Sequence, residues 1–154
     1  MRKAMLLLAF LTLAGSLWAA DPIIGTWKLN LEKSKGSQPS AAPKEQLEVY
    51  RELDSGEIEL TLTRTMVDGT SSLSKLTWPA QGGTVTFVQS DPRGRSLVET
   101  LIAPGEWYVT YMRDGKQYLT VHKVVSKDKK MLMQTFKGIF SGKSIVSVSV
   151  FERQ

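Results

Sequence analysis

The chain has 154 residues, no cysteine and one histidine, and its 20 Lys and Arg residues against 15 Asp and Glu residues give a formal charge of +5. The absence of cysteine excludes disulfides, thiolate metal ligands and a lipid-modified cysteine, so stability must come from packing and hydrogen bonds. The cations are spread along the chain, and "KDKK" at 127–130 is the only short basic run, so nucleic acid is not an expected partner.

The first twenty residues have the composition of an export signal. Two cations precede an apolar run over 4–14, and two alanines end the segment. The run is shorter than the roughly 20 residues that a membrane-spanning helix needs. We therefore expect residues 1–20 to be removed as a signal peptide rather than kept as an anchor. The remaining domain, 21–154, is expected in the periplasm or outside the cell.

From Ile24 onward apolar and polar residues alternate, and turn-forming residues interrupt the alternation about every ten residues. This pattern is typical of short antiparallel strands joined by hairpins. Ten strands are predicted, over 24–30, 45–53, 57–67, 70–78, 83–90, 95–102, 106–113, 116–126, 130–137 and 144–153. Segment 31–44 lacks the alternation and contains two prolines, so a loop with a short helical turn over 32–35 is expected there.

A flat sheet of ten strands would leave its edges open to aggregation, whereas closure into a barrel removes the edges. The predicted fold is therefore all-β: a single antiparallel up-and-down β-barrel of about ten (eight to ten) strands.

Facing pairs at two hairpin turns predict which residues lie inside the barrel. If residues 55–56 and 68–69 form two-residue turns, one face is mainly apolar and contains three cations. The predicted inner residues are Leu47, Val49, Arg51, Leu53, Ile58, Leu60, Leu62, Arg64, Met66, Leu73 and Lys75. Polar residues such as Glu48 and Tyr50 are then predicted to face solvent.

Arg64 lies centrally in this apolar face, where an unpaired guanidinium costs several kcal/mol. It can extend to solvent at a barrel end, or pair with an internal acid such as Glu99. It can also bind the anionic head group of a ligand, with Arg51 or Lys75 nearby. The sequence leaves these readings open. The candidate ligand-binding residues are Arg64, Leu60, Leu62, Arg51, Lys75, Phe87, Phe136 and Phe151.

A further two-residue turn at 114–115 predicts Tyr111 opposite Tyr118 and Trp107 opposite His122. This aromatic ladder could line a cavity or cover the outside of the barrel, because the opposite face of the hairpin is equally apolar.

His122 is the only histidine of the chain. Neither a metal site nor a serine triad is therefore predicted, and no cofactor or catalysis is expected. His122 is predicted to be a packed strand residue beside Trp107. The alternative is that it serves as the axial ligand of a haem inside the barrel.

The stretch "GTW", Gly25 to Trp27, on the predicted first strand, and Arg153 in the closing "SVFERQ" resemble features of the calycins, the superfamily of lipocalins and intracellular fatty-acid-binding proteins. The resemblance implies that Trp27 plugs the closed end of the barrel and that Arg153 packs across its ring. The strand number resembles the fatty-acid-binding branch more than the eight-stranded lipocalins. "GTWKLN" and "VVSKD" also resemble stretches of small exported bacterial lipocalin-like proteins.

Two departures from the fatty-acid-binding branch matter. Segment 31–44 is too short to supply the two-helix lid of that branch. Ser149 and Phe151 stand where its last strand often carries the Arg and Tyr that bind a carboxylate. The resemblance therefore does not imply the class of ligand.

The sequence thus predicts an exported, non-catalytic protein that binds a hydrophobic or amphipathic small molecule, with an anionic ligand as one option. The alternative is a filled barrel that acts as a protein-interaction or envelope-structural module. Ile139 and Phe140, beside the last turn, are predicted to fold over the barrel mouth as a lid, or else to contact a membrane or a protein.

Overall fold

The structure is a computed structural model that describes residues 20–36, 43–89, 94–140 and 142–154. The predicted signal peptide, apart from Ala20, lies outside these ranges. Eleven strands and no helix occur within them. The strands are β1 (Gly25–Gly36), β2 (Pro43–Glu52), β3 (Glu57–Met66), β4 (Ser71–Pro79), β5 (Gly82–Thr84), β6 (Thr86–Gln89), β7 (Arg95–Ala103), β8 (Glu106–Arg113), β9 (Lys116–Val125), β10 (Met131–Phe140) and β11 (Lys143–Arg153).

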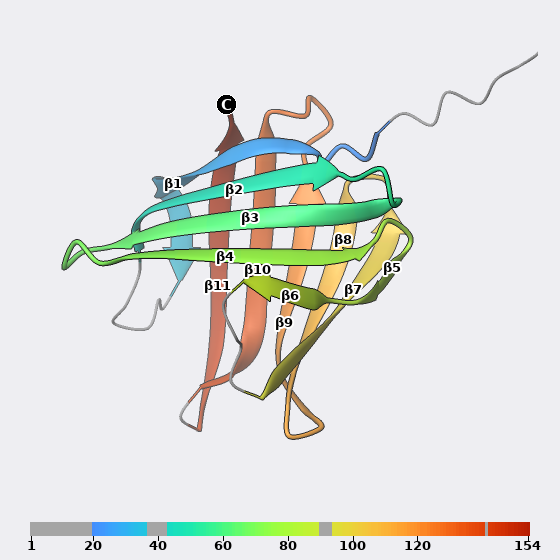
Figure 1. The fold of residues 1–154 in the computed structure, drawn as a ribbon. Helices are drawn as coiled ribbons and strands as arrows, with labels where there is room; N and C mark the ends of the chain where they lie inside the picture. Colours follow the sequence, from blue (N-terminus) through green and yellow to red (C-terminus); the bar gives the residue numbers. More distant parts are fainter. Residues whose placement is uncertain (1–19, 37–42, 90–93, 141) are drawn as a thin grey trace, which may run out of the picture.

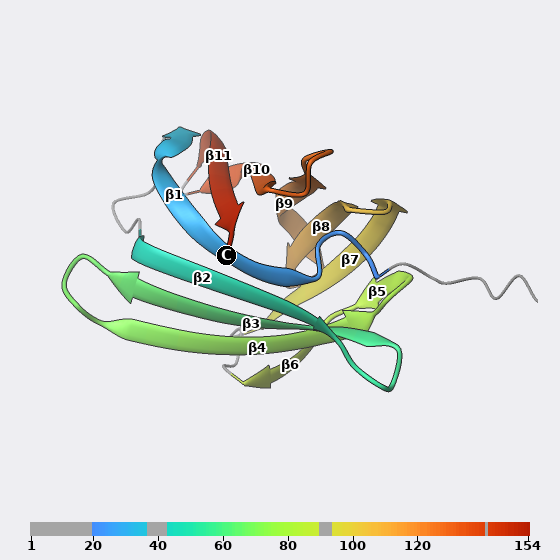
Figure 2. The same cartoon turned by 90° about the horizontal axis from the view of Figure 1, so that it is seen from above.

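All eleven strands belong to one sheet, in the order β5-β7-β8-β9-β10-β11-β1-β2-β3-β4-β6. The sheet curves around a common interior, with β1 to β4 on one side and β7 to β11 on the other (Figures 1 and 2). Each pair of neighbouring strands is antiparallel. The predicted all-β antiparallel barrel is confirmed, as a nearly closed barrel of eleven strands.

The eleventh strand arises because the predicted strand over 83–90 changes partner at Val85. β5 pairs with β7, whereas β6 pairs with β4. The backbone N–H of Val85 donates to the carbonyl of Leu97 at 2.9 Å. A single bent segment therefore joins both edges of the sheet and brings the barrel close to closure.

The loops of the β2–β3 and β3–β4 hairpins have three residues, not two. Leu53 N donates to Glu57 O at 2.8 Å around 54–56, and Met66 N donates to Thr70 O at 2.8 Å around 67–69. The third residue of each loop is a glycine with positive φ, 79° at Gly56 and 85° at Gly69. Glycine suits this left-handed position in three-residue loops.

One extra loop residue shifts the register by one, and a shift of one turns every side chain of a strand to the other face. The inner face of β2 therefore carries Gln46, Glu48 and Tyr50, and that of β4 carries Leu76 and Trp78. The predicted inward positions of Leu47, Val49, Arg51, Leu73 and Lys75 are wrong. On β3 the predicted inner residues Ile58, Leu60, Leu62 and Arg64 keep their face.

The β8–β9 hairpin has the predicted two-residue turn, with φ of 50° at Asp114 and 72° at Gly115. A register shift between Tyr111 and Met112 then places Tyr111 opposite Leu119 and Trp107 opposite Lys123.

The shift decides which aromatic residues of this hairpin meet. The predicted pair of Trp107 with His122 is wrong, because His122 lies opposite Tyr108. The rings of Tyr111 and Tyr118 still meet edge to face near the tip, with centroids 6.2 Å apart.

β1 is longer than predicted. It continues to Gly36 with an irregularity between Asn30 and Lys35, where a loop with a helical turn was expected. Ser34 holds the irregular part, because its Oγ donates to Asn30 O at 2.6 Å within β1 and accepts from Val150 N of β11 at 3.0 Å.

Trp27 seals one end of the barrel. Its side chain is completely buried, and its Nε1 donates to Ile23 O at 2.7 Å. Arg153 Cζ lies 4.2 Å from the ring centroid, so the stacking expected from the sequence is present. The Arg153 guanidinium also donates to the carbonyls of Pro22, Ile24 and Lys129.

The backbone conformation and the surroundings of Gly25, two residues before Trp27, explain why a glycine stands there. Gly25 has φ of 142°, and a Cβ at this position would lie 2.3 Å from Arg153 Nη1. Any other residue would be strained at this φ, and its Cβ would force the Arg153 guanidinium to move.

Candidate binding site inside the barrel

A chain of polar side chains crosses the interior, and we call it the inner polar chain. Arg64 Nε donates to Gln46 Oε1 at 2.9 Å, and Gln46 Nε2 donates to Glu48 Oε1 at 2.6 Å. The second oxygen of Glu48 accepts from Tyr50 OH at 2.6 Å and from Gln134 Nε2 at 2.7 Å. Glu48 thus accepts three hydrogen bonds inside the barrel, as a buried carboxylate requires. Burial, followed by the charge of Glu48, raises the pKa of Tyr50 well above its ordinary value.

A buried ion pair lies next to this chain. Lys123 Nζ is 2.8 Å from Glu99 Oε1, and both side chains are almost fully buried. The ammonium also stands 5.4 Å from the ring centroid of Tyr50 and 5.3 Å from that of Trp78. Burial raises the pKa of Glu99 above its ordinary value, and Lys123 opposes this rise.

Six of the predicted ligand-binding residues lie on the inner face. Leu60 and Phe151 are buried in the core, and Leu62, Phe87 and Phe136 are partly buried against it. Arg64 joins them on the inner face of β3, where it stands opposite Gln46 and Ser72. The inner face thus combines apolar side chains with the polar neighbours Gln46 and Ser72 of Arg64.

Arg51 and Lys75, the other two predicted ligand-binding residues, lie outside the barrel. Both contact Glu59, Arg51 through a hydrogen bond and Lys75 with its Nζ 3.4 Å from Glu59 Oε2. The hydrogen bond from Arg51, helped by Lys75, lowers the pKa of Glu59. These two cations are explained by an outer ion-pair cluster, so the site does not include them.

The Arg64 half of the interior is more open than the Trp27 half. The Arg64 side chain is exposed although it points inward, and its two terminal nitrogens have no hydrogen-bond partner among the described residues. Small residues occupy inner positions around it, since Ser74 lies opposite Leu62, and Ser147 opposite Phe136. We call this half, with Leu62, Arg64, Ser74, Phe136 and Ser147 at its inner positions, the mouth.

The sequence pattern does not predict the inner polar chain, because it gives the β2–β3 and β3–β4 loops two residues instead of three. It does not predict the buried ion pair because the register shift between Tyr111 and Met112 is what places Lys123 opposite Trp107. The sequence does contain a signal for the correct register. In "DSG" at 54–56 and "VDG" at 67–69 the glycine is the last loop residue, which fits a three-residue loop with its third residue left-handed. Counting from these loops turns Glu48 and Tyr50 inward.

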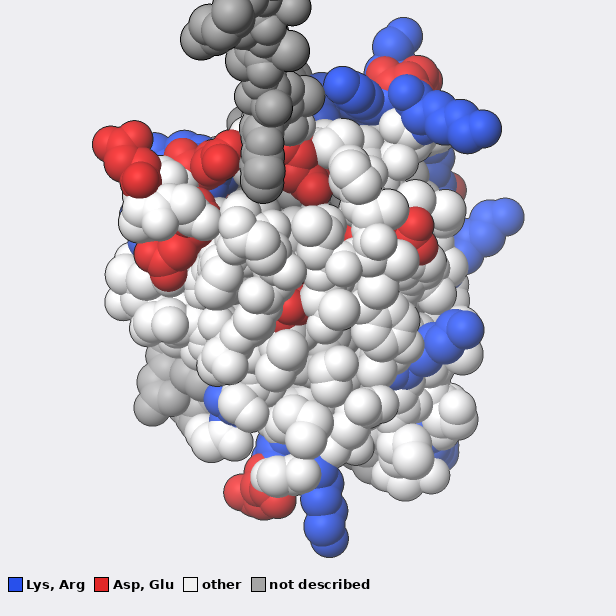
Figure 3. Space-filling model, turned by 90° about the vertical axis from the view of Figure 1, so that its right-hand side faces the viewer, with Lys and Arg blue, Asp and Glu red and all other residues white. Residues whose placement is uncertain are grey.

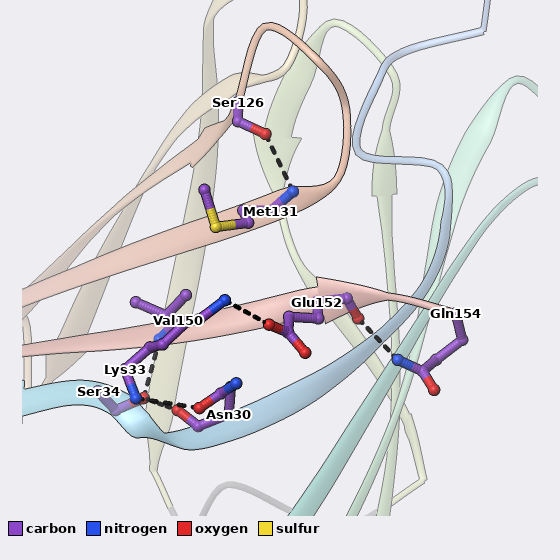
Figure 4. Close-up of polar contacts among 8 residues, drawn as sticks. All are labelled: Asn30, Lys33, Ser34, Ser126, Met131, Val150, Glu152 and Gln154. Atoms are coloured by element: carbon purple, nitrogen blue, oxygen red, sulfur yellow. Dashed lines mark hydrogen bonds and ion pairs between the residues drawn. The ribbon is translucent and has the colours of Figure 1, made fainter.

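Two hollows lie on the outside of the barrel. An open groove of about 550 Å³ borders β1, β11 and the β9–β10 turn. Figure 4 shows its polar contacts, among them Lys33 Nζ at 2.7 Å from Glu152 Oε1 and Met131 N donating to Ser126 Oγ at 3.0 Å. A smaller hollow of about 80 Å³ is lined by Tyr108, Thr120, His122, Thr135 and Lys137.

His122 belongs to this outer surface. Its Nε2 is 2.8 Å from Glu106 Oε1, and its ring lies against Tyr108. It therefore does not reach the barrel interior, where a haem ligand would be needed. Within the described ranges no group of three or more His, Cys, Asp or Glu side chains is arranged to hold a metal ion.

The last hairpin does not cover the mouth with Ile139. This residue lies opposite Ser144 near the end of β10 and is 64% exposed. The side chain of Phe140 lies outside the described part of the structure. The predicted rim contact with a membrane or protein therefore stays a prediction.

In the described part of the chain, no helix has the length and apolar character that crossing a membrane requires.

No protein-family model and no curated protein matches the chain. Solved structures do resemble it. The fluorescent protein UnaG superposes with a TM-score of 0.60 at 15% identity, over 86% of this chain and 97% of that one. The zebrafish ileal bile-acid-binding protein, complexed with cholic acid, superposes with a TM-score of 0.52 at 9% identity, over 86% of this chain and 99% of that one. The phycobiliprotein lyase CPES of Guillardia theta superposes with a TM-score of 0.50 at 10% identity, over 86% of this chain and 89% of that one.

At these identities the likeness concerns the fold alone. It confirms the predicted resemblance to calycin barrels.

Proposed function

We propose that the barrel binds a hydrophobic or amphipathic small molecule at its mouth, without catalysis, and that Arg64 binds an anionic head group of this ligand. The observation that carries the proposal is the hydrogen bonding of the Arg64 guanidinium. Its Nε is fixed by Gln46, while its terminal nitrogens have no partner among the described residues. A guanidinium held in this way presents two parallel donors, which suits a carboxylate.

The surroundings of Arg64 supply the other half of an amphipathic site. Leu62, Phe87 and Phe136 are inward and only partly buried, and Tyr111 joins them from β8. Burial raises the pKa of Tyr111, so its hydroxyl stays neutral beside a bound anion. A site of this kind, apolar with a few placed polar groups, is typical of small-molecule pockets. A barrel of similar fold has been solved with cholic acid, an amphipathic acid.

Arg64→Leu is expected to weaken the binding of an anionic amphipath at least about tenfold, because a hydrogen bond to a charged group contributes about 1.5–3 kcal/mol. The measurement is the displacement of an amphipathic fluorescent dye by hexadecanoate. Arg51→Leu is the matched control, since it removes an arginine from the neighbouring strand on the outer face. Equal affinity in the two variants would contradict the role of Arg64.

We further propose that the protein is exported, on the composition of residues 1–20. Native mass spectrometry of the protein purified from its own host tests both parts of the proposal. A mass without residues 1–20 and a co-purifying small molecule are expected. An intact N-terminus would count against export. A bare mass, together with failure to bind the dye, would count against the carrier function.

The second candidate function is a protein-interaction module. It is favoured by exposed apolar residues on β7 and β8, namely Val98, Ile102 and Tyr108. In the view of Figure 3, the charged side chains gather toward the edges of the molecule and leave the middle of this face mostly uncharged. Under this alternative, Arg64→Leu leaves partner binding intact.

A further inference from the structure

The hairpin turns at the mouth end of the barrel carry exposed cations. The β8–β9 and β10–β11 hairpins turn at this end, on the lower side of Figure 1, whereas the β9–β10 hairpin turns at the Trp27 end. The two mouth-end hairpins lie side by side, because β9 pairs with β10 and places Thr120 opposite Lys137. We call the following exposed residues the hairpin rim: Arg113, Lys116, Lys137, Ile139, Lys143 and Val146.

Neighbouring side chains do not neutralise the cations of the hairpin rim. Arg113 and Lys116 stand directly opposite each other in the β8–β9 ladder, and like charges in this position destabilise a sheet. Among the described residues, no carboxylate forms an ion pair with any cation of the rim. Asp114 is the only acid in segments 113–116 and 137–146. An anionic partner at this end would therefore relieve a repulsion within the protein.

The Trp27 end of the barrel differs in charge. Its turns and strand ends contain several acids, namely Glu52, Asp54, Glu57, Glu106, Asp128 and Glu152. Ion pairs do form in this half, among them that of Lys33 with Glu152. Positive charge is therefore in excess at the mouth end and balanced by acids at the other. An anionic surface attracts such a molecule with its positive end first.

The hairpin rim also contains exposed apolar side chains. Ile139 is 64% exposed, and Val146, which stands opposite Lys137, is 55% exposed. Anionic lipids attract cations to a membrane surface, and apolar side chains next to those cations can enter the boundary between head groups and acyl chains. A nucleic acid would contact the cations and leave the apolar side chains in water. The combination favours a lipid surface as the partner.

We propose that the hairpin rim docks the barrel, mouth end first, on a membrane surface that contains anionic lipids. The cations contact the lipid head groups, and Ile139 and Val146 enter the boundary below them. The rim does not include Arg64, so the docking goes beyond the proposed function and does not depend on it.

The first test measures co-sedimentation of the protein with two kinds of vesicle. One contains equal parts of phosphatidylglycerol and phosphatidylcholine, and the other contains phosphatidylcholine alone. Binding is expected to the anionic vesicles only, and it should be lost at about 0.5 M salt, which screens exposed charges beyond a few ångströms. No binding to the anionic vesicles at low salt, or equal binding to both kinds, would overturn the inference.

The double variant Lys116→Glu with Lys143→Glu should bind the anionic vesicles at least about twentyfold more weakly, because each cation near such a surface strengthens binding about fivefold. Lys127→Glu with Lys130→Glu is the matched control. It makes the same change in net charge at exposed lysines of the β9–β10 turn, at the opposite end. The control should stay within about threefold of the unmodified protein, since its charges lie more than a Debye length from the docked surface.

Both double variants change exposed side chains and share the same N-terminus, so the comparison isolates the rim. Equal urea midpoints of the two variants check that both are folded. Equal losses of binding in the two would show that net charge alone matters, and would overturn the inference. Ile139→Ser should also weaken binding, whereas unchanged binding would remove the apolar part of the contact and contradict the proposal.

A fluorescent label tests the orientation of the docked barrel. The chain has no cysteine, so one introduced cysteine carries one environment-sensitive fluorophore. A label at Ser144, which stands opposite Ile139, should brighten on anionic vesicles, whereas a label at Lys127 should not. The reverse pattern, or equal brightening at both positions, would overturn the docking through the rim. A DNA duplex that binds as tightly as the vesicles would overturn the choice of lipid, because it would show a general attraction to polyanions.

Discussion

Lys123→Met is expected to lower the free energy of unfolding by about 3–5 kcal/mol, because it leaves Glu99 buried without its counter-ion. The loss should also depend on pH. Without Lys123, burial and the charge of Glu48 both raise the pKa of Glu99 unopposed, so this pKa in the folded state lies still further above the unfolded value. A raised pKa means that the folded state holds the proton more tightly, so stability is retained at low pH and falls as pH rises.

Urea unfolding of Lys123→Met at acidic and neutral pH measures both effects, and the loss should be larger at neutral pH. The double variant Lys123→Met with Glu99→Leu removes both charges and should recover most of the stability. A double variant as unstable as the single one would show that packing of the lysine stem, and not the unpaired carboxylate, accounts for the loss.

Trp27→Ala is expected to cost about 3–5 kcal/mol, the range for removing a large buried aromatic side chain. The substitution leaves a cavity at the closed end of the barrel. It also removes the hydrogen bond to Ile23 O and the surface on which Arg153 stacks. Thermal or urea unfolding measures the loss. Trp27→Phe keeps much of the apolar area and should lose clearly less.

A double-mutant cycle of Trp27→Ala with Arg153→Ala isolates the stacking of the guanidinium on the indole. The expected coupling is about 1–2 kcal/mol, since this contact is partly removed from water. Additive losses would mean that the hydrogen bonds of Arg153 to Pro22, Ile24 and Lys129 hold the barrel end without help from the ring.

The sequence predicts the fold well because period-two alternation and turn residues are local signals. Trp27 and Arg153 were identified by resemblance, and their contact is present in the structure. The division of the strand at Val85 had no local signal. It depends on which sheet edge each half of the segment can reach, and this is a property of the assembled barrel.

The interior was harder to predict because β2 has two plausible inner faces. Leu47 and Val49 look like core residues, whereas Glu48 and Tyr50 alternate with them as if they faced water. A buried Glu48 is tolerated only because Gln46, Tyr50 and Gln134 donate to it, and Gln134 comes from a strand far along the chain. Gln46 and Tyr50 belong to β2 itself, but nothing within β2 indicates that Gln134 completes the set of donors.

The ladder between β1 and β11 has a consequence for the order of folding. It places Trp27 opposite Arg153, whereas every other ladder joins strands that are consecutive in the chain or separated by one other strand. Contacts between distant residues require the loss of more chain entropy before they contribute, so hairpins form early and this ladder forms late. Changes at the closed end should therefore act mainly on the rate of unfolding, because interactions formed after the transition state affect that rate. The lifetime of the closed barrel is then governed by the junction between its two most distant strands.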